Sequence, residues 1–425
     1  MNITVVAVGT RGDVEPHLAL CRELAFAGYR PTLCAPADFA GAAQALRVPF
    51  HSIPVRFRHL IGTAEGGTLL ASEANTWRLL RELRVIAAKV AGEVSNAIRD
   101  ACEDADAVCH SPLGLPARFF ARERGIPAIA TFMQPLGFTR ERSSPLFPLP
   151  TSMPRAIHGA THVLVEELFW LAARSLMQRH LSEKLPRSGY FAGVRRSGSP
   201  LLFAYSPSLV PTPRDWTPAM RVTGYWTFPR DPSWRPPVGL LDFLAAGPPP
   251  VCIGFGSMNS PRIDAIFAAS LRAVAATGRR ACVLTGWSGR SLPRDAGGDV
   301  YILESAPHEW LFPRVASVIH HGGAGTTAAA LRAGIPSVIV PFFFDQSFWG
   351  RWLYESGLGP APISFRGLSD DGLRRAIETA EASGAMRARV RELGRRLRLE
   401  DGTGTAVAAI GEILHRRVGM ARKTG

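Results

Sequence analysis

Residues 320–327 read HHGGAGTT, a run in which two histidines, three glycines and two threonines follow an apolar stretch and precede an apparent helix. Such residues suit a metal site, a phosphate cradle or a tight turn. Adjacent histidines at a strand end point to opposite faces, and no third ligand has a zinc-like spacing, so metal binding is disfavoured. Free N–H groups and the helix dipole at the start of a helix favour a phosphate. Glycines also serve a plain turn, so this run alone leaves both interpretations open.

A carboxylate and an amide, Asp345 and Gln346, occur in the next loop, PFFFDQSFWG. Such a pair among aromatic residues is suited to hydrogen-bonding sugar hydroxyls. Asp345 also suits the cap of a helix expected over 346–355, and the two roles are compatible. A third loop, GFGSM, offers the hydroxyl of Ser257 to a phosphate.

These loops need a scaffold that brings several strand ends together. Short β-branched runs alternate with amphipathic segments, which is typical of parallel α/β units. Apolar residues at three- and four-residue spacing predict a helix over 76–100. Strands are expected at 3–8, 31–36, 50–54, 107–112, 127–131, 251–257, 281–286, 300–305, 317–323 and 336–342.

The proline-rich stretch 211–250 is interpreted as a linker, after which the α/β pattern restarts. The predicted fold class is therefore α/β, with two Rossmann-like doubly wound parallel-sheet domains facing a cleft. The domains are expected at 1–230 and 231–405. Residues 406–425 are expected to form a C-terminal helix that packs back on the first domain.

Composition excludes several function classes. The 425 residues carry a net charge of +14, yet only three are lysines (Lys89, Lys184 and Lys423), so neither a P-loop nor a pyridoxal Schiff base fits. The basic stretch 387–400 has no interleaved aromatic residues and is expected to be a solvated helix face rather than a nucleic-acid site. The DxD-like EDAD at 103–106 is expected to be a solvated helix end.

The opening MNITVVAVGT predicts a strand rather than a signal peptide, and no apolar run approaches about 20 residues. With six scattered cysteines expected to be reduced and buried, the sequence predicts a cytoplasmic protein. Residues 161–185 predict a helix that is apolar on several faces. It is expected either to pack on the first domain or to make weak peripheral contact with a membrane.

Five loops occur in order across nearly the whole chain: GTRGDVEP, GFGSM, APHEWLFP, HHGGAGTT and PFFFDQSFWG. In this combination the sequence resembles the inverting, nucleotide-sugar-dependent glycosyltransferases of the GT-B fold. The likeness is greatest to the sterol glucosyltransferases and the bacterial natural-product glycosyltransferases. It implies an acceptor-binding first domain, a nucleotide-sugar-binding second domain, and neither a cofactor nor a metal.

The resemblance also assigns donor-binding residues. His321, with the amides and hydroxyls of the following helix start, would hold the diphosphate of a UDP- or dTDP-sugar, assisted by Ser257. Asp345 and Gln346 would hold the hexose, and His308 would contact the base. Plant members usually carry a stacking tryptophan where this chain has Ser305. The helix-start residues are Gly323, Ala324, Gly325 and Thr326.

The resemblance implies that Asp13 is the catalytic base, because it occupies the position at which many relatives carry a catalytic histidine. A carboxylate in a partly closed cleft can have its pKa raised toward the range useful for a general base. Alternatively, Asp13 caps a helix that has Pro16 in its first turn. His17 is a competing base expected to face elsewhere, and Arg11, beside Thr10 on the acceptor side, is expected to orient Asp13 or to neutralise charge.

The acceptor segment is expected at 131–148, with the helix at 161–185. Phe132, Met133 and Phe138, with Trp170, suit a large lipophilic acceptor such as a sterol, terpenoid, macrolide or other polyketide. Core packing explains the same side chains nearly as well. Two other functions fit the architecture, a nucleotide-sugar epimerase and a non-catalytic GT-B binding protein.

Overall fold

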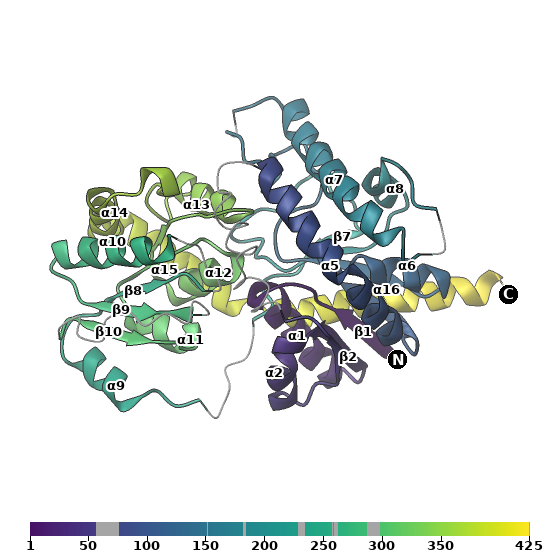
Figure 1. The fold of residues 1–425 in the computed structure, drawn as a ribbon, viewed down its shortest axis with the longest axis horizontal. Coiled ribbons are helices and arrows are strands. Elements are labelled where there is room, and N and C mark those ends of the chain that lie inside the picture. Colours follow the sequence, from purple (N-terminus) through teal and green to yellow (C-terminus); the bar gives the residue numbers. More distant parts are fainter. Residues whose placement is uncertain are drawn as a thin grey trace. The chain divides into compact units, whose positions relative to one another are not determined.

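The computed structural model describes residues 1–56, 76–150, 152–181, 184–227, 234–256, 258, 262–286 and 298–424; of 76–84, 86–87 and 417–424 it describes the backbone only. The described chain forms two compact units. The first comprises residues 1–56, 77–227 and 400–424, and the second the described residues from 234 to 399. Each unit is built on its own parallel sheet (Figure 1).

The first unit contains a seven-stranded sheet in the order β3-β2-β1-β4-β5-β6-β7, with every neighbouring pair parallel. Its strands are β1 (Asn2–Val6), β2 (Arg30–Pro36), β3 (Phe50–Ile53), β4 (Ala107–His110), β5 (Ala128–Phe132), β6 (Leu201–Phe203) and β7 (Met220–Val222). Its helices are α1 (Arg11–Phe26), α2 (Ala40–Ala45), α5 (Thr76–Cys102), α6 (Pro116–Glu123), α7 (Arg155–Met177), α8 (Tyr190–Arg196) and α16 (Gly402–Thr424).

The second unit contains a five-stranded parallel sheet in the order β10-β9-β8-β11-β12. Its strands are β8 (Val251–Gly254), β9 (Ala281–Leu284), β10 (Val300–Leu303), β11 (Ser317–His320) and β12 (Ser337–Ile339). Its helices are α9 (Val238–Ala245), α10 (Ile263–Ala276), α11 (His308–Leu311), α12 (Ala324–Ala333), α13 (Gln346–Glu355), α14 (Asp370–Ala382) and α15 (Gly384–Leu399).

The second sheet is covered by helices on both faces. In β8, Val251 and Ile253 join a core cluster that also contains buried residues of α10 and α14. Cys252, between them, joins a second cluster with residues of α9, α11 and α12. Because successive strand residues point to opposite faces, this alternation confirms the doubly wound arrangement.

The proline-rich stretch 211–250 is not a simple linker, and that interpretation was wrong. It contains β7, which pairs with β6 at the edge of the first sheet, and α9, whose Leu240 is fully buried in the second unit. The prolines favoured a linker over either element in the sequence interpretation. Proline is nevertheless tolerated beside a short edge strand and at a helix start.

The predicted helix over 161–185 is displaced toward the N-terminus. α7 begins at Arg155, six residues before the expected start, and ends at Met177, eight residues before the expected end. Trp170, expected in the acceptor pocket, is fully buried and stacks on Tyr190 of α8 at 4.1 Å between ring centroids. It is a core residue.

The last part of the chain belongs to the first unit from Glu400 onward. α16 packs against α1 and buries Ala406, Ile410 and Leu414. Arg221, the middle residue of β7, pairs with Glu412 at 2.7 Å, and Ser206 donates to Glu400 at 2.6 Å. The sequence placed the start of this segment at 406.

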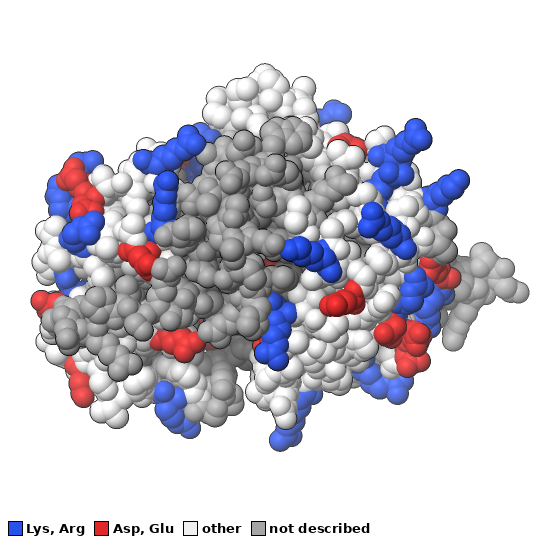
Figure 2. Space-filling model, viewed as in Figure 1, with Lys and Arg blue, Asp and Glu red and all other residues white. Residues whose placement is uncertain are grey.

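The basic surface residues stand among acidic ones on the face seen in Figure 2. In the second unit, for example, Arg272 pairs with Asp370 and Arg374 pairs with Asp371, each at 2.6 Å. The stretch 387–400 lies mostly in α15, which buries Val390 and Leu397 and exposes most of its arginines. All six cysteines are free and buried. No helix in the described ranges is long and apolar enough to cross a bilayer.

Candidate functional site

The loops singled out in the second unit follow strands of one parallel sheet. The sheet order reverses direction between β8 and β11, so the loops after these two strands lie at the topological switch point, where α/β proteins bind ligands. The loops approach each other closely there: a Cβ built on Gly256, after β8, would lie 3.4 Å from the ring of His321, after β11. Sequence order alone does not show this convergence.

The helix that begins at this point, α12, has an open N-terminus. Its N-cap is Gly323, which has no side chain to cap the first N–H groups. A Cβ built on Gly325, in the first turn, would have no described atom within 4 Å. The first turn of α12 therefore presents N–H groups without a side-chain cap among the described residues, and the positive end of the helix dipole, to accessible space.

The turn between β11 and α12 depends on Gly322. Its φ is +87°, and a Cβ there would lie 2.7 Å from Cγ2 of Ile339 and 3.0 Å from the carbonyl oxygen of Gln346. Any side chain would strain the backbone and collide with β12 and α13. Glycine is required here to bring the loops after β11 and β12 together.

The two histidines of this loop are not a pair. His320 is the last residue of β11 and is fully buried, and its Nδ1 accepts from the N–H of Gly322 at 3.1 Å. The ring of His321 stands at 88° to it, with its Nε2 2.5 Å from the position of a Cβ on Gly323. His321 is thus the histidine beside the start of α12.

The ring of His321 is neutral at physiological pH. Its enclosure by protein lowers the pKa to about 4 although part of the residue stays accessible, and its Nδ1 is buried without a hydrogen-bond partner among the described residues. A neutral imidazole can donate a single hydrogen bond to an anion. The positive potential at this place therefore comes from the helix start.

Asp345 and Gln346 lie at the start of α13 and are largely buried. Oε1 of Gln346 accepts from the N–H of Phe342 at 2.7 Å, and its Nε2 lies 3.7 Å from the sulfur of Met258. Oδ2 of Asp345 accepts from the indole of Trp349 at 2.9 Å, and its side chain does not cap α13. Both residues therefore fix the loop after β12, whatever else they bind.

One feature of this loop had no sequence signal. Phe344 has a φ of +54°, which is uncommon for a bulky residue, and its side chain is 43% exposed. Such strain persists where the surrounding structure determines the conformation. The contacts of Asp345 and Gln346 on its C-terminal side provide that constraint.

The remaining donor residues are less defined. His308 begins α11 and stacks on Phe312 with a centroid distance of 4.4 Å. Ser305, just before it, is exposed. Ser257 lies outside the described residues.

Asp13 lies at the equivalent position of the first sheet. The order of that sheet reverses between β1 and β4, and the loop after β1 leads into α1. Thr10 is the N-cap of α1 and forms a capping box with Asp13, whose Oδ2 accepts from the N–H of Thr10 at 3.0 Å. Asp13 is thus the third residue of the helix rather than its N-cap, and Pro16 lies in the second turn rather than the first.

His17 faces the interior, one turn further along α1. It is fully buried, its Nδ1 contacts the carbonyl of Asp13 at 2.6 Å, and its Nε2 contacts the hydroxyl of Thr131 at 2.7 Å. The carbonyl can only accept, so Nδ1 carries the proton and Nε2 accepts from Thr131. Arg11 donates to Glu15 at 2.7 Å.

The aromatic residues assigned to the acceptor have partners in the first unit. Phe132 stacks on Phe203 at 5.4 Å, and Met133 is buried. Phe138 is half-buried, with the guanidinium of Arg195 4.5 Å from its ring centroid. Core packing therefore accounts for Met133 and Phe132, while Phe138 keeps an accessible edge.

The EDAD segment follows α5 and precedes β4. Asp106 accepts from the N–H of Asn2 at 2.7 Å, and the carbonyl of Asp104 accepts from the amide of Asn2 at 2.9 Å. These contacts anchor the start of β1. Within the described ranges, no group of three His, Cys, Asp or Glu side chains is arranged to hold a metal ion.

Two family models match the chain. Residues 3–140 match the glycosyltransferase family 28 N-terminal domain, and residues 285–409 match the erythromycin biosynthesis protein CIII-like C-terminal domain. The first match falls on the first unit and the second mainly on the second unit, and together they include the loops after β1, β11 and β12.

Named relatives cover nearly the whole chain. A sterol 3-beta-glucosyltransferase of Arabidopsis thaliana is 33% identical over 423 residues, which are 96% of this chain and 67% of that protein. A sterol 3-beta-glucosyltransferase of Emericella nidulans is 32% identical over 430 residues, again 96% of this chain. The chain spans only 30% of the length of this fungal relative.

Solved structures show the same fold at lower identity. The glycosyltransferase of kitacinnamycin is 19% identical with a TM-score of 0.67, covering 97% of this chain and 99% of that one. The calicheamicin glycosyltransferase is also 19% identical, with a TM-score of 0.65 and 98% of both chains covered. Together with the Arabidopsis relative, these likenesses show that the chain belongs to the GT-B-fold glycosyltransferase family that includes the sterol 3-beta-glucosyltransferases.

Proposed function

We propose that the protein transfers a hexose from a UDP- or dTDP-sugar to a hydroxyl of a lipophilic acceptor, with inversion at the anomeric carbon. The observation that carries the proposal is the uncapped start of α12 beside His321, in a chain of this family. The epimerase and the non-catalytic protein are not favoured, because the relatives are named as glucosyltransferases.

The second unit would bind the donor. The first N–H groups of α12 and the neutral His321 would donate hydrogen bonds to the diphosphate, and Gly325 would leave room for it. These donors would stabilise the charge that develops on the leaving group and so take the role that a divalent cation has in other enzymes. The proposed reaction is therefore metal-independent.

The first unit would supply the base. Asp13 would take the proton of the acceptor hydroxyl as its oxygen attacks the anomeric carbon from the face opposite the diphosphate. A single displacement without a covalent intermediate inverts the configuration. His17 is not the base in this proposal, because its two ring nitrogens face Asp13 and Thr131 within the core.

The relatives guide the choice of substrates. Those named as sterol 3-beta-glucosyltransferases support a sterol-like acceptor with an alcohol group. A spinosyn rhamnosyltransferase of the same fold was solved with thymidine diphosphate, at 19% identity and a TM-score of 0.63. We therefore propose a uridine or thymidine diphosphate sugar as the donor. The proposed acceptors are sterols, terpenoids, macrolides and other polyketides.

The first test is the substitution Asp13→Asn. An asparagine oxygen can still accept from the N–H of Thr10, so the capping box persists, but it cannot take a proton. We expect kcat/KM for glycoside formation to fall by about 10²–10⁴ with unchanged donor affinity and thermal stability. Product formation is measured by mass spectrometry with uridine and thymidine diphosphate sugars against pooled lipophilic alcohols.

Asp13→Ala is the companion variant. It should lose the same activity and in addition about 1 kcal/mol of stability, because the carboxylate that accepts from the N–H of Thr10 in the capping box is removed. Turnover of Asp13→Asn equal to that of the unmodified protein would remove Asp13 from the base role. A changed nucleotide sugar formed without any acceptor would point to the epimerase instead.

A further inference from the structure

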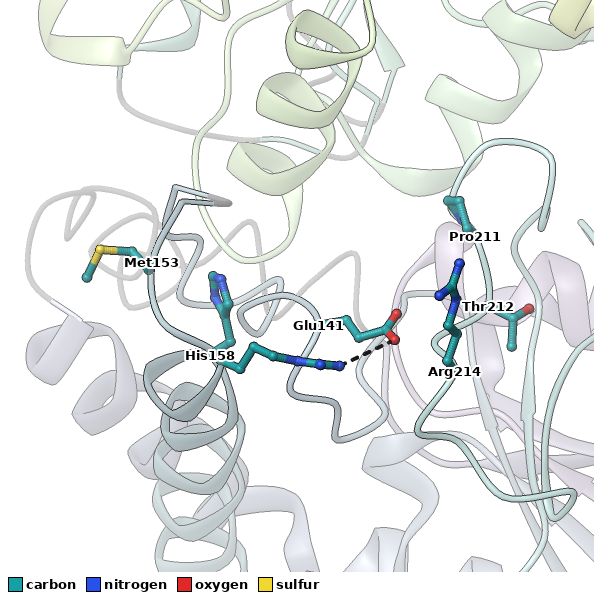
Figure 3. A pocket seen from close by; sticks show the side chains of 7 residues that line it. Glu141, Met153, His158, Pro211, Thr212 and Arg214 are labelled. Atoms are coloured by element: carbon teal, nitrogen blue, oxygen red, sulfur yellow. Dashed lines mark ion pairs between the residues drawn. The ribbon is translucent and has the colours of Figure 1, made fainter.

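A separate pocket lies in the first unit at the N-terminal end of α7. Its volume is about 450 Å³. Figure 3 shows its lining side chains, which come from the start of α7 and from the segments around 141, 153 and 212. One of them, Glu141, lies in the segment 131–148 that was expected to line the acceptor site. The lining residues are Glu141, Met153, Arg155, His158, Pro211, Thr212 and Arg214.

His158 is the most unusual member of this lining. It is only 1% exposed, and both of its ring nitrogens are buried without a hydrogen-bond partner among the described residues. Buried polar groups in folded proteins are normally paired, because an unpaired one loses its hydration without compensation. A ligand in the pocket that accepts a hydrogen bond from this ring would supply the missing partner.

The charge around the pocket favours a negative ligand. Arg155 reaches Glu141 at 3.7 Å, and its side chain is 72% exposed, so this ion pair is weak (dashed line in Figure 3). Arg214 has no carboxylate within ion-pair distance among the described residues. One carboxylate therefore faces two guanidinium groups.

Asp215, the residue after Arg214, does not form an ion pair with it, so the excess of positive charge at the pocket remains. Its Oδ1 accepts from the hydroxyl of Thr139 at 2.6 Å, and its Oδ2 accepts from the N–H of Arg140 at 2.8 Å. Arg142 donates to the carbonyl of Pro211 at 2.8 Å. These bonds join the two loops, so the walls of the pocket are built before any ligand arrives.

The start of α7 adds to the positive potential. This helix has 23 residues, and its N-cap, Pro154, provides no side-chain cap. The N–H groups of Ile157 and His158 donate to the carbonyl of Pro154, so only the first two N–H groups, those of Arg155 and Ala156, lack intrahelical partners. Met153 and Pro211 supply apolar surface beside these polar groups.

We propose that this pocket binds the oxyanion of an acidic, lipophilic acceptor, so that the preferred acceptor carries a carboxylate, sulfate or phosphate in addition to its hydroxyl. His158, Arg155 and Arg214 bind the oxyanion, and Met153 and Pro211 contact the adjoining apolar body. The inference rests on the proposed sugar transfer for the identity of the ligand as an acceptor. The pocket itself can be tested without any transfer.

The experiment compares lithocholate with its methyl ester, two compounds with the same ring system and hydroxyl that differ in the carboxylate. Binding to the full chain is measured by calorimetry at low ionic strength, below the micelle concentration. We expect lithocholate to bind about tenfold more tightly than the ester, as one or two charge-assisted hydrogen bonds would give. Arg214→Gln and Arg155→Gln should each reduce this ratio to about threefold or less.

Arg196→Gln is the matched control, because Arg196 is an exposed arginine at the end of α8 outside the pocket lining. It should leave the ratio unchanged, and 0.5 M salt should abolish the ratio in the unmodified protein. Equal affinity for acid and ester, no binding of either, or an equal effect of Arg196→Gln and Arg214→Gln would overturn the proposal.

The same preparations separate this inference from the proposed function. Selective binding of lithocholate in a protein that transfers no sugar to any acceptor supports the pocket and contradicts the transferase. Sugar transfer to the methyl ester and to lithocholate with equal kcat/KM, together with equal affinities, contradicts the pocket and supports the transferase.

Discussion

At the scale of single residues, the candidate site is built from groups that also hold their loops in place. The carboxylate of Asp13 closes the capping box of α1, Gln346 ties the loop after β12, and Asp345 accepts from Trp349. Removing any of these side chains would change local structure as well as chemistry. Near-isosteric substitutions such as Asp13→Asn therefore separate the two effects better than alanine does.

Two glycines of one loop give a paired prediction at this scale. Gly322→Ala forces a side chain into a left-handed backbone and against Ile339, so we expect a loss of roughly 2–4 kcal/mol of stability. Gly325→Ala meets no described atom and improves helix propensity, so stability should hold or rise by up to about 1 kcal/mol.

Donor binding should separate the same two variants. The methyl group of Gly325→Ala stands where the diphosphate is proposed to approach, and we expect affinity for uridine or thymidine diphosphate to fall about tenfold or more. Denaturant unfolding and calorimetric titration check both parts. Unchanged diphosphate affinity in Gly325→Ala would argue against binding at the start of α12.

At the scale of elements, α7 is the helix whose outward face departs from ordinary surface composition. Ile157, Leu164 and Leu171 follow one another at seven-residue intervals and are 39%, 47% and 63% exposed. Seven residues are close to two helical turns, so these side chains form one stripe. An exposed apolar stripe on a helix is typical of a surface that meets lipid or protein.

We expect this stripe to give weak, peripheral membrane binding in a chain of net charge +14. Leu164→Glu combined with Leu171→Glu should leave stability within about 0.5 kcal/mol, because both side chains are exposed. The same pair should lower co-sedimentation with vesicles containing phosphatidylglycerol. Leu399→Glu, at a position 77% exposed in the second unit, is the control. Equal sedimentation of all three proteins would exclude α7 as the contact.

At the scale of the whole molecule, the two ends of the chain stabilise the same unit. α16 packs on α1, and its residues Ile410 and Leu414 are almost completely buried, although the entire second unit separates them from α1 in sequence. The first unit is therefore complete only when residues from 400 onward are present. Long-range contacts of this kind cannot be predicted from the local periodicity of the sequence.

Truncation after Leu399 should therefore destabilise the first unit and spare the second. The loss of two large buried side chains alone removes roughly 3–6 kcal/mol of apolar burial. In calorimetry we expect one unfolding transition to move to lower temperature or disappear while another stays in place. Ile410→Ala should produce the same effect to a smaller extent, about 2–5 kcal/mol. A uniform shift of both transitions would contradict the assignment of α16 to the first unit.

Acid should destabilise the protein through its buried histidines. Burial lowers the pKa of His17, His110, His162 and His321 to about 4 in each case, below the value of 6.5 expected in the unfolded chain. The unfolded chain therefore binds more protons between these values. This contribution to stability is complete above pH 6.5 and is lost as the pH falls to about 4.

Each of these histidines contributes up to about 3 kcal/mol to that pH dependence. His110→Gln should flatten the fall in unfolding free energy between pH 6.5 and 4 relative to the unmodified protein. Denaturant titrations at several pH values test this, with His51→Gln, at a half-buried position in β3, as the comparison. An equal slope in the unmodified protein and in His110→Gln would contradict the account.

The sequence by itself determined the fold class, most of the strands and the loops that carry polar residues, because these follow from local periodicity and turn residues. It placed α12 and α13 at their observed starts for the same reason. It could not find β7 within its prolines, since pairing with β6 rather than propensity makes that strand. It also put Trp170 in a pocket, because an aromatic residue gives the same local signal in a core and in a binding site.

Only the tertiary structure decided which polar residues have partners. It showed that His17 lies between Asp13 and Thr131, that a side chain at position 322 would collide with the backbone of Gln346, and that α16 completes the first unit. The run HHGGAGTT named the residues of the proposed phosphate site, but the sheet order places the loop after β8 beside the one that carries His321. Hydrogen bonding and burial depend on neighbours that are distant in sequence, and those neighbours are fixed only when the sheets form.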